Sequence, residues 1–200
     1  DNGKTIQELA LLAHSSLELP EGVEGHLDAQ AVYNPPNLTY PFGAYFCVVD
    51  IDPGTGAVKV RRFIAVDDCG PRINPMIVEG QVHGGLVDGI GMALMEVIAF
   101  DPDAGTNLGG SYMDYLLPTA WETPGYELHE VVTPCPHHPI GAKGIGECAT
   151  VGGPAAFVNA VMNALKGTGV RNIDMPLLPD RVYEAITQRH DVSGAPPIKT

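Results

Sequence analysis

The chain has 200 residues, of which 44% are hydrophobic and 18% charged, and its 11 basic and 24 acidic side chains give a formal net charge of −13. This composition is typical of a globular protein and not of a disordered one. The negative charge disfavours nucleic acid and anionic membrane surfaces as partners. No apolar run approaches the roughly 18 residues that a membrane-spanning helix needs.

The first forty residues predict one short helix and a long connection. A capping box at Thr5–Glu8 predicts a helix that ends near Ser15. Residues 17–42 are rich in proline, glycine and asparagine, which indicates a connecting segment. We expect one edge strand within it, near residues 26–33.

Two strands and a long helix are predicted for the centre of the chain. Residues 44–51 and 58–66 are typical of strands joined by a hairpin turn at 52–56. The pair Asn74–Pro75 is typical of a helix start, and the helix is predicted to run to about Ile98. Several glycines interrupt it, which is costly in a free helix. Close approach of another helix or of a ligand to its backbone would explain them.

The last third of the chain predicts one strand and two helices. The strand is expected at 126–132, and the first helix at 154–166 with Gly167 closing it. A second helix starts at Pro179, and residues 192–200 are expected to form a frayed tail. Without internal repeats, these elements predict an α+β fold class with segregated strands and helices.

The strongest functional signal is the segment Gly141–Glu147. Its glycines, Gly141, Gly144 and Gly146, allow positive φ angles and a close approach of the backbone to a ligand. The loop ends in Glu147, and a carboxylate held in a tight, partly dehydrated place can serve as a general base. The alternative is an exposed glutamate on a glycine-rich turn before a helix.

Other candidate chemistry receives less support. The glycine-rich loop lacks the ending of a phosphate-binding P-loop, and no dinucleotide-binding fingerprint follows a strand. His137 and His138 are adjacent and flanked by prolines, which indicates a stiff turn more than a metal site. His83 is interpreted as a hydrogen-bonded packing residue, and Cys148 is given no role. The four cysteines show no CxxC spacing, so no metal ligand is assigned.

Four segments carry a resemblance to a known family. Gly141–Glu147 resembles the glycine-rich loop of the molybdenum hydroxylases, the xanthine oxidase superfamily, which ends in an active-site glutamate. Asn74–Gly91 resembles the family's cofactor-contacting segment, whose glutamine corresponds to Gln81. Residues 114–124 and 133–140 most resemble the large subunit of its carbon monoxide dehydrogenase branch. The order and spacing of these segments match the family.

The resemblance implies a site and a reaction. Glu147 would deprotonate or orient the oxygen that attacks the substrate, beside molybdenum held by molybdopterin cytosine dinucleotide. The substrate would be carbon monoxide, with an aldehyde or an N-heterocycle as alternatives. A non-catalytic scaffold segment of the same fold is a further alternative. The implied cofactor-binding residues are Gln81, Asn74, Lys143, Gly144, Ile145 and Gly146.

The resemblance also implies partners. Residues 1–200, which begin without methionine, would be a C-terminal fragment of the molybdopterin-binding domain of a large subunit. The remainder of that subunit, an FAD-binding medium subunit and a 2Fe–2S small subunit would complete a dimer of heterotrimers. Copper, where present, would be held by a cysteine upstream of Asp1. A cytoplasmic enzyme is expected, with association at the inner face of the cell membrane left open.

Overall fold

The computed structural model describes residues 3–15, 19, 21–22 and 25–188 and divides the chain into two compact units, Asp1–Pro36 and Asn37–Thr200. The predicted tail 192–200 lies outside the described residues. None of the described helices has the length and apolar character needed to cross a membrane.

The first unit contains helix α1 (Ile6–Ser15), as predicted. Its capping box is formed, because the Thr5 N–H donates to Glu8 Oε2 at 2.7 Å and the Glu8 N–H donates to Thr5 Oγ1 at 3.3 Å. The edge strand predicted near residues 26–33 is wrong. These residues are exposed and belong to no strand of the described sheet.

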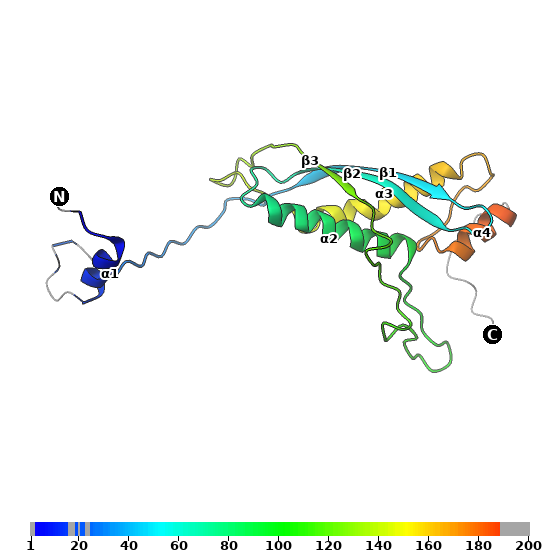
Figure 1. Ribbon diagram of the computed structural model, residues 1–200, viewed down its shortest axis with the longest axis horizontal. Coiled ribbons are helices and arrows are strands. Elements are labelled where there is room, and N and C mark those ends of the chain that lie inside the picture. Colours follow the sequence, from blue (N-terminus) through cyan, green and yellow to red (C-terminus); the bar gives the residue numbers. More distant parts are fainter. Residues whose placement is uncertain (1–2, 16–18, 20, 23–24, 189–200) are drawn as a thin grey trace. The chain divides into compact units, whose positions relative to one another are not determined.

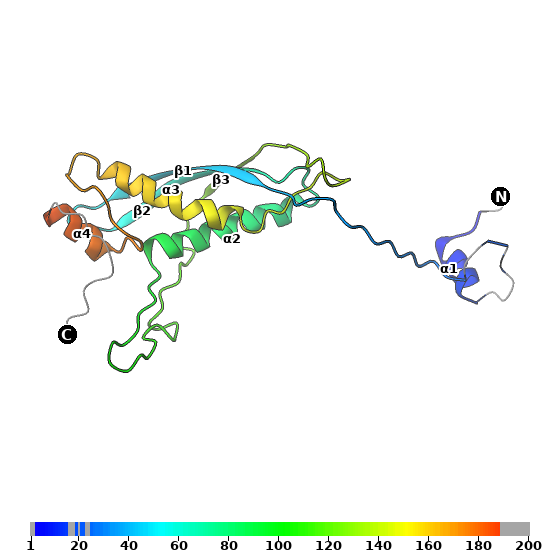
Figure 2. The ribbon, with the colours of Figure 1, turned by 180° about the vertical axis from the view of Figure 1, so that it is seen from behind.

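The second unit is a three-stranded sheet covered by helices on one face (Figure 1). Strands β1 (Phe42–Ile51) and β2 (Val58–Asp68) form the predicted antiparallel hairpin, and β3 (Tyr126–Glu130) pairs with β2 in parallel. Helices α2 (Pro75–Leu94) and α3 (Cys148–Ala164) lie side by side on the sheet, as the view from behind also shows (Figure 2). The α+β fold class predicted from the sequence is therefore confirmed.

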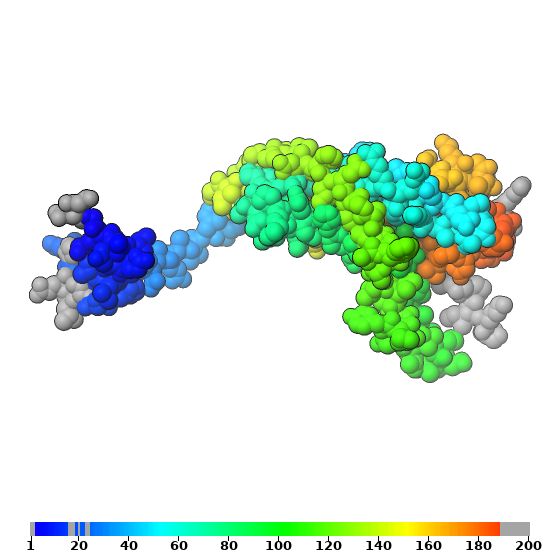
Figure 3. Space-filling model, viewed as in Figure 1, coloured from blue at the N-terminus to red at the C-terminus, as the bar shows by residue number. Residues whose placement is uncertain are grey.

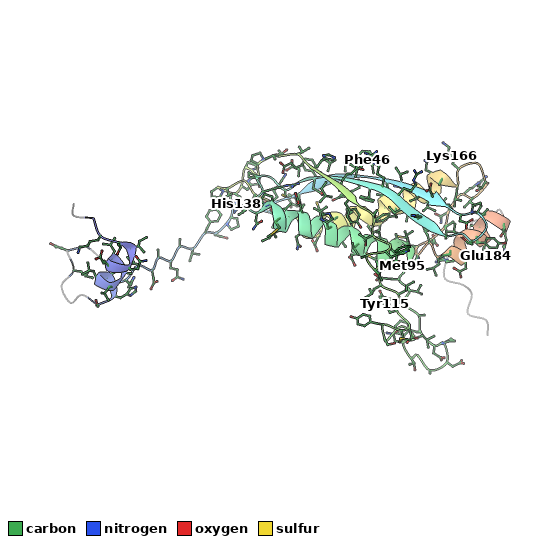
Figure 4. All side chains as sticks on the ribbon, in the orientation of Figure 1. Phe46, Met95, Tyr115, His138, Lys166 and Glu184 are labelled. Atoms are coloured by element: carbon green, nitrogen blue, oxygen red, sulfur yellow. The ribbon has the colours of Figure 1, made fainter. Side chains whose placement is uncertain are left out.

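The core lies between the sheet and the two helices. Phe63 of β2 is fully buried there, and its ring centroid lies 4.8 Å from that of Phe157 on α3 and 6.1 Å from that of Tyr126 on β3. Because successive strand residues point to opposite faces, Tyr45 of β1 faces the helices and its neighbour Phe46 faces away. Phe46 is 60% exposed on the far side of the sheet (Figure 4).

A second core cluster connects the C-terminal helix to the sheet. Helix α4 (Pro179–Gln188) buries Val182 and Ala185, which belong to this cluster together with Leu177 and the end of α3. Residues 96–125 leave the body at the end of α2 and project as an arm (Figure 3). The Tyr115 hydroxyl donates to Glu96 Oε2 at 2.5 Å, at the root of this arm.

Three element boundaries differ from the sequence-based prediction in ways that matter for the site. β2 runs two residues further, to Asp68, because it continues to pair with β1 and β3. α2 ends at Leu94 and not near Ile98, since the N–H groups of the next two residues both turn back to the Gly91 carbonyl. α3 begins at Cys148, six residues before the predicted start, so Pro154 lies inside the helix.

The early start of α3 depends on its packing against α2. A Cβ atom at Gly85 would lie 2.8 Å from Ala149 Cβ, and one at Gly89 would lie 3.2 Å from Pro154 Cδ. These glycines let the two helices approach closely, which was one of the two predicted explanations for them. Gly80 and Gly84 differ, because a Cβ atom there would meet nothing within 4 Å.

Gly85 and Gly84 form a matched pair for a test of this packing. Gly85→Ala should lower the free energy of unfolding by about 1–3 kcal/mol, because the added methyl group overpacks the contact with α3. Gly84→Ala should raise it by up to about 1 kcal/mol, because alanine is the better helix former and the space is open. Urea unfolding of the 200-residue chain would measure both. A Gly85→Ala chain as stable as Gly84→Ala would contradict the close contact.

Candidate functional site

Four segments meet at one end of the second unit: the end of β2, the start of α2, the loop before α3, and the start of α3. The loop is tied back on itself by the Cys135 N–H, which donates to the Gly141 carbonyl at 2.8 Å. It is tied to the end of β2 by the Lys143 N–H, which donates to the Cys69 carbonyl at 2.7 Å. The glycine-rich loop is therefore held at the end of β2, near the start of α2.

Two glycines shape the close contact between the loop and β2. Gly141 and Gly70 have φ angles of +77° and +66°, in the left-handed region that favours glycine. A Cβ atom on Gly70 would lie 2.2 Å from the Gly141 carbonyl oxygen. The loop passes so close to the turn after β2 that neither position accommodates a side chain.

His138 lies in a turn, as the sequence predicted, and His83 lies exposed on α2. His138 is part of a turn, because its carbonyl accepts from the Gly141 N–H at 2.9 Å and its Nδ1 accepts from the Ile140 N–H at 3.3 Å. His83 Nδ1 donates to the Glu79 carbonyl at 2.9 Å, and its ring centroid lies 5.4 Å from that of Tyr126. Among the described residues, no group of three or more His, Cys, Asp or Glu side chains could hold a metal ion.

Glu147 is the N-cap residue of α3. Its carbonyl accepts from the Val151 N–H at 2.9 Å, while its side chain makes no capping hydrogen bond and is exposed. The Glu147 carboxylate therefore makes no capping hydrogen bond to the described helix α3. The dehydrated surroundings expected from the sequence are not supplied by the described part of the chain.

Gln81 lies beside the loop. Its Oε1 atom would be 3.5 Å from a Cβ atom on Gly146, so a helix and a loop 65 residues apart in the sequence are brought into contact. Gly144 is exposed, and a Cβ atom there would meet nothing within 4 Å. Ile145 packs partly against the core and its carbonyl accepts from the Cys148 N–H at 3.2 Å.

Two of the predicted cofactor contacts are engaged within the chain. The Asn74 side chain caps α2 by accepting from the Ile77 N–H at 3.3 Å. The Lys143 ammonium lies 2.8 Å from Asp68 Oδ1, and the two side chains are only 6% and 0% exposed. The Lys143 N–H already donates to the Cys69 carbonyl. Of the predicted backbone donors, those of residues 144–146 therefore remain for a ligand.

The sequence-based reasoning missed the acidic pair Asp67 and Asp68 at the end of β2. Burial opposes the ionisation of Asp68, but Lys143, Thr133 and the Gly70 N–H together hold the pKa of this carboxyl below its usual value. The Gly70 N–H donates to Asp68 Oδ1 at 2.8 Å. The signal that could have revealed them is a pair of consecutive acidic residues at the end of an apolar strand. It was missed because the predicted strand ended at residue 66, one residue before Asp67.

Asp67 behaves in the opposite way. It is 2% exposed, and burial raises the pKa of its carboxyl although Tyr45, Cys148 and Arg72 partly offset this. The Tyr45 hydroxyl donates to Asp67 Oδ1. Burial, and next the Asp67 charge, raise the pKa of the Cys148 thiol, which disfavours a reactive thiolate.

An open surface adjoins Gln81 and Glu147. A Cβ atom on Gly80, Gly84 or Gly144 would meet no described atom within 4 Å. Glycine in a helix costs about 1 kcal/mol relative to alanine, and among the described residues no contact requires it at 80 or 84.

The chain is similar to a known domain family and to several characterised proteins. The profile of the molybdopterin cofactor-binding domain matches residues 1–124. The carbon monoxide dehydrogenase large chain of Hydrogenophaga pseudoflava is 50% identical over 187 residues, which are 94% of this chain and 23% of that protein.

Solved structures give the same result. The crystal structure of the Cu,Mo-CO dehydrogenase has a TM-score of 0.82 and 51% identity, over 93% of this chain and 23% of that one. Quinoline 2-oxidoreductase from Pseudomonas putida 86 has a TM-score of 0.79 and 41% identity, over 86% and 22% of the two chains. The chain thus spans about a quarter of the length of these relatives.

The two aspartates should give opposite pH dependences of stability. The lowered pKa of Asp68 means that its contribution is complete above the ordinary carboxyl pKa of about 4 and is lost as the pH falls. Asp68→Asn leaves Lys143 buried without a charged partner, which should cost about 3–5 kcal/mol at pH 7 and less below pH 4.

The raised pKa of Asp67 means that its contribution is complete below about pH 4 and is lost as the pH rises through the folded-state pKa. Asp67→Asn should therefore become more stable relative to the unaltered chain as the pH rises from 4 to 7. Urea unfolding of both variants across this range is the measurement. Parallel pH profiles for the two variants would show that the carboxyls do not differ as described.

Proposed function

The chain belongs to the molybdopterin cofactor-binding domain family, and from this premise we propose that it forms one wall of a molybdenum active site in a larger oxidoreductase subunit. The observation that carries the proposal is the position of Gln81 Oε1, 3.5 Å from where a Cβ atom on Gly146 would lie, with Glu147 next in the chain and exposed. A hydrogen-bonding amide, a glycine-rich backbone and a free carboxylate thereby share one surface.

The residues of this surface suit a pterin group. The Gln81 amide can both donate to and accept from the edge of a pterin. Backbone groups of Gly144, Ile145 and Gly146 can approach an anionic end of the cofactor without side chains between them. Asn74 acts indirectly in this proposal, by fixing the start of α2 and so the direction of Gln81. The form we propose is molybdopterin cytosine dinucleotide.

Glu147 is the proposed catalytic residue. When bound, the molybdenum cofactor supplies the two-electron oxidation and the oxygen transfer. The Glu147 carboxylate accepts the proton of the attacking oxygen nucleophile, or orients it by a hydrogen bond. The absence of a capping hydrogen bond leaves both carboxylate oxygens free of α3 for this purpose. Coverage by the rest of the subunit would supply the dehydrated surroundings that a general base needs.

The reaction we propose is the oxidation of carbon monoxide with water to carbon dioxide. It is supported by the 50% identity to a carbon monoxide dehydrogenase large chain. The 41% identity to quinoline 2-oxidoreductase favours N-heterocycle hydroxylation as the second candidate, and an aldehyde is a third possible substrate. Copper, if used, would be bound by residues outside this chain.

The larger assembly belongs to the same proposal. The remainder of the large subunit encloses the cofactor, and an FAD-binding medium subunit and a 2Fe–2S small subunit carry the electrons away. Two such heterotrimers form a dimer in the cytoplasm. Dye-linked assays of the complete enzyme with carbon monoxide, quinoline and benzaldehyde test the substrate. Turnover of quinoline or benzaldehyde without turnover of carbon monoxide would reject the first candidate.

Glu147→Gln in the complete enzyme should lower kcat by about 10²–10⁴-fold, because the amide cannot accept the proton. Molybdenum content, measured by mass spectrometry, should remain near that of the unaltered enzyme. Glu184→Gln on α4, an exposed glutamate far along the chain, is the matched control and should leave kcat unchanged. Substantial turnover by a molybdenum-loaded Glu147→Gln enzyme would rule out Glu147 as the base.

Gln81→Ala and Gly144→Val should weaken cofactor retention more than folding. The first removes hydrogen bonds to a buried polar ligand, about 1–3 kcal/mol, and the second places a side chain in the open space where the ligand approaches. Molybdenum and pterin content after gel filtration should fall in both, at nearly unchanged melting temperature. Gln188→Ala serves as the control, and full cofactor content in both test variants would contradict the proposed contacts.

A further inference from the structure

We propose that Asp67 and Asp68, the two adjacent buried carboxylates that end β2, are positioning residues for Glu147. Asp68 holds Lys143, which precedes Glu147 in the chain. Asp67 interacts with Cys148, which follows Glu147, and with Tyr45, which packs against α3. The two aspartates have this role only if Glu147 is the base proposed above, so the inference rests on the proposed function.

The Asp68 anchor fixes the glycine loop four residues before Glu147. Lys143 is held at two points, by its side chain to Asp68 Oδ1 at 2.8 Å and by its N–H to the Cys69 carbonyl at 2.7 Å. Its ammonium also lies 4.9 Å from the centroid of the Phe42 ring. The loop is rich in glycine and would otherwise have many conformations, so these contacts determine where its last residues lie.

The Asp67 anchor fixes the first turn of α3 directly after Glu147. Its carboxylate accepts from the Tyr45 hydroxyl and interacts with the Cys148 thiol. The Tyr45 ring packs against the helix, since a Cβ atom on Gly152 would lie 2.2 Å from this ring. The start of α3, six residues earlier than the sequence predicts, is thereby held onto the sheet.

The two anchors reach opposite sides because they are consecutive strand residues. Asp67 lies opposite Gly43, on the face of the sheet that carries Tyr45 and the helices, and Asp68 lies opposite Phe42 on the other face. The segment from Lys143 to Cys148 passes around the end of β2 from one face to the other. Glu147 has no side-chain capping contact of its own, so these flanking anchors set its position.

Stability alone does not require this arrangement. Replacing a buried ion pair by well-packed apolar side chains is often neutral or stabilising, and two adjacent buried carboxylates are costly to desolvate. Precise placement of a catalytic group does require it, since a displacement of about 1 Å can lower a rate by about 100-fold. A purely stabilising role and a positioning role therefore predict different results. Only the positioning role predicts a lower kcat for enzyme that still carries its cofactor.

The test uses the complete enzyme with Lys143→Met and Tyr45→Phe, assayed with whichever of carbon monoxide, quinoline and benzaldehyde the unaltered enzyme oxidises fastest. Turnover is divided by bound molybdenum. We expect kcat per molybdenum to fall at least tenfold in each variant, with KM changed less than threefold. Amide hydrogen exchange in the peptide containing Glu147 should increase. Unchanged kcat per molybdenum in both variants, however much their stability or metal content falls, overturns the inference.

A double variant tests whether Lys143 acts through Glu147. Glu147→Gln combined with Lys143→Met should be no slower per molybdenum than Glu147→Gln alone, because the group being positioned is already absent. A double variant whose loss of kcat per molybdenum equals the product of the two single-variant losses would overturn the inference. Arg61→Met, which removes an exposed ion pair with Asp50 on the same sheet, is the matched control and should leave kcat unchanged.

The outcomes separate this inference from the proposed function. Full activity of the Glu147→Gln enzyme rejects Glu147 as the base. It also rejects the inference that Asp67 and Asp68 position a catalytic group. An inactive Glu147→Gln enzyme beside fully active Lys143→Met and Tyr45→Phe enzymes leaves the base intact and rejects only the positioning. If Lys143→Met fails to fold, Tyr45→Phe alone decides, because it removes a single hydroxyl group and retains the aromatic packing.

Discussion

The close approach of α2 and α3 is the constraint on which the rest of the site depends. Gly85 and Gly89 allow the backbone of α2 to contact Ala149 and Pro154 of α3 without an intervening side chain. That contact brings the first half of α2 beside the start of α3. Gln81 lies next to Gly146 because the helices are this close, so larger residues at the crossing would move Gln81 away from the loop as well as loosen the core.

The two buried aspartates at the end of β2 also help to fix the path of the glycine-rich loop. Asp68 is buried beside a buried ammonium, so its charge is compensated, whereas Asp67 is buried beside a hydroxyl and a thiol, so its charge is penalised. The pKa values of these two neighbours thus shift in opposite directions, because their side chains lie on opposite faces of the sheet. The glycine-rich loop between them and Glu147 has little conformational preference of its own, and it takes its path from these side chains.

Some surfaces of the second unit are uncovered within the described residues. The glycines at 80, 84 and 144 border open space, and Phe46 is exposed on the outer face of the sheet. Parallel strand pairs such as β2 and β3 usually lie in sheets covered on both faces. Both features agree with a chain that spans about a quarter of the length of its relatives.

The sequence by itself determined the local elements and the candidates. Capping and turn residues gave α1, the β1–β2 hairpin and the start of α2, because these depend on contacts a few residues apart. The glycine pattern and the final carboxylate of Gly141–Glu147, with the resemblance they carry, indicated the family.

Only the tertiary structure decided how far β2 and α3 extend, because their ends are set by pairing and packing with segments distant in sequence. For the same reason it alone revealed Asp67, Asp68 and Tyr45. It also showed that the Lys143 side chain is engaged by Asp68 within the fold, a contact between residues 75 positions apart that no local pattern encodes.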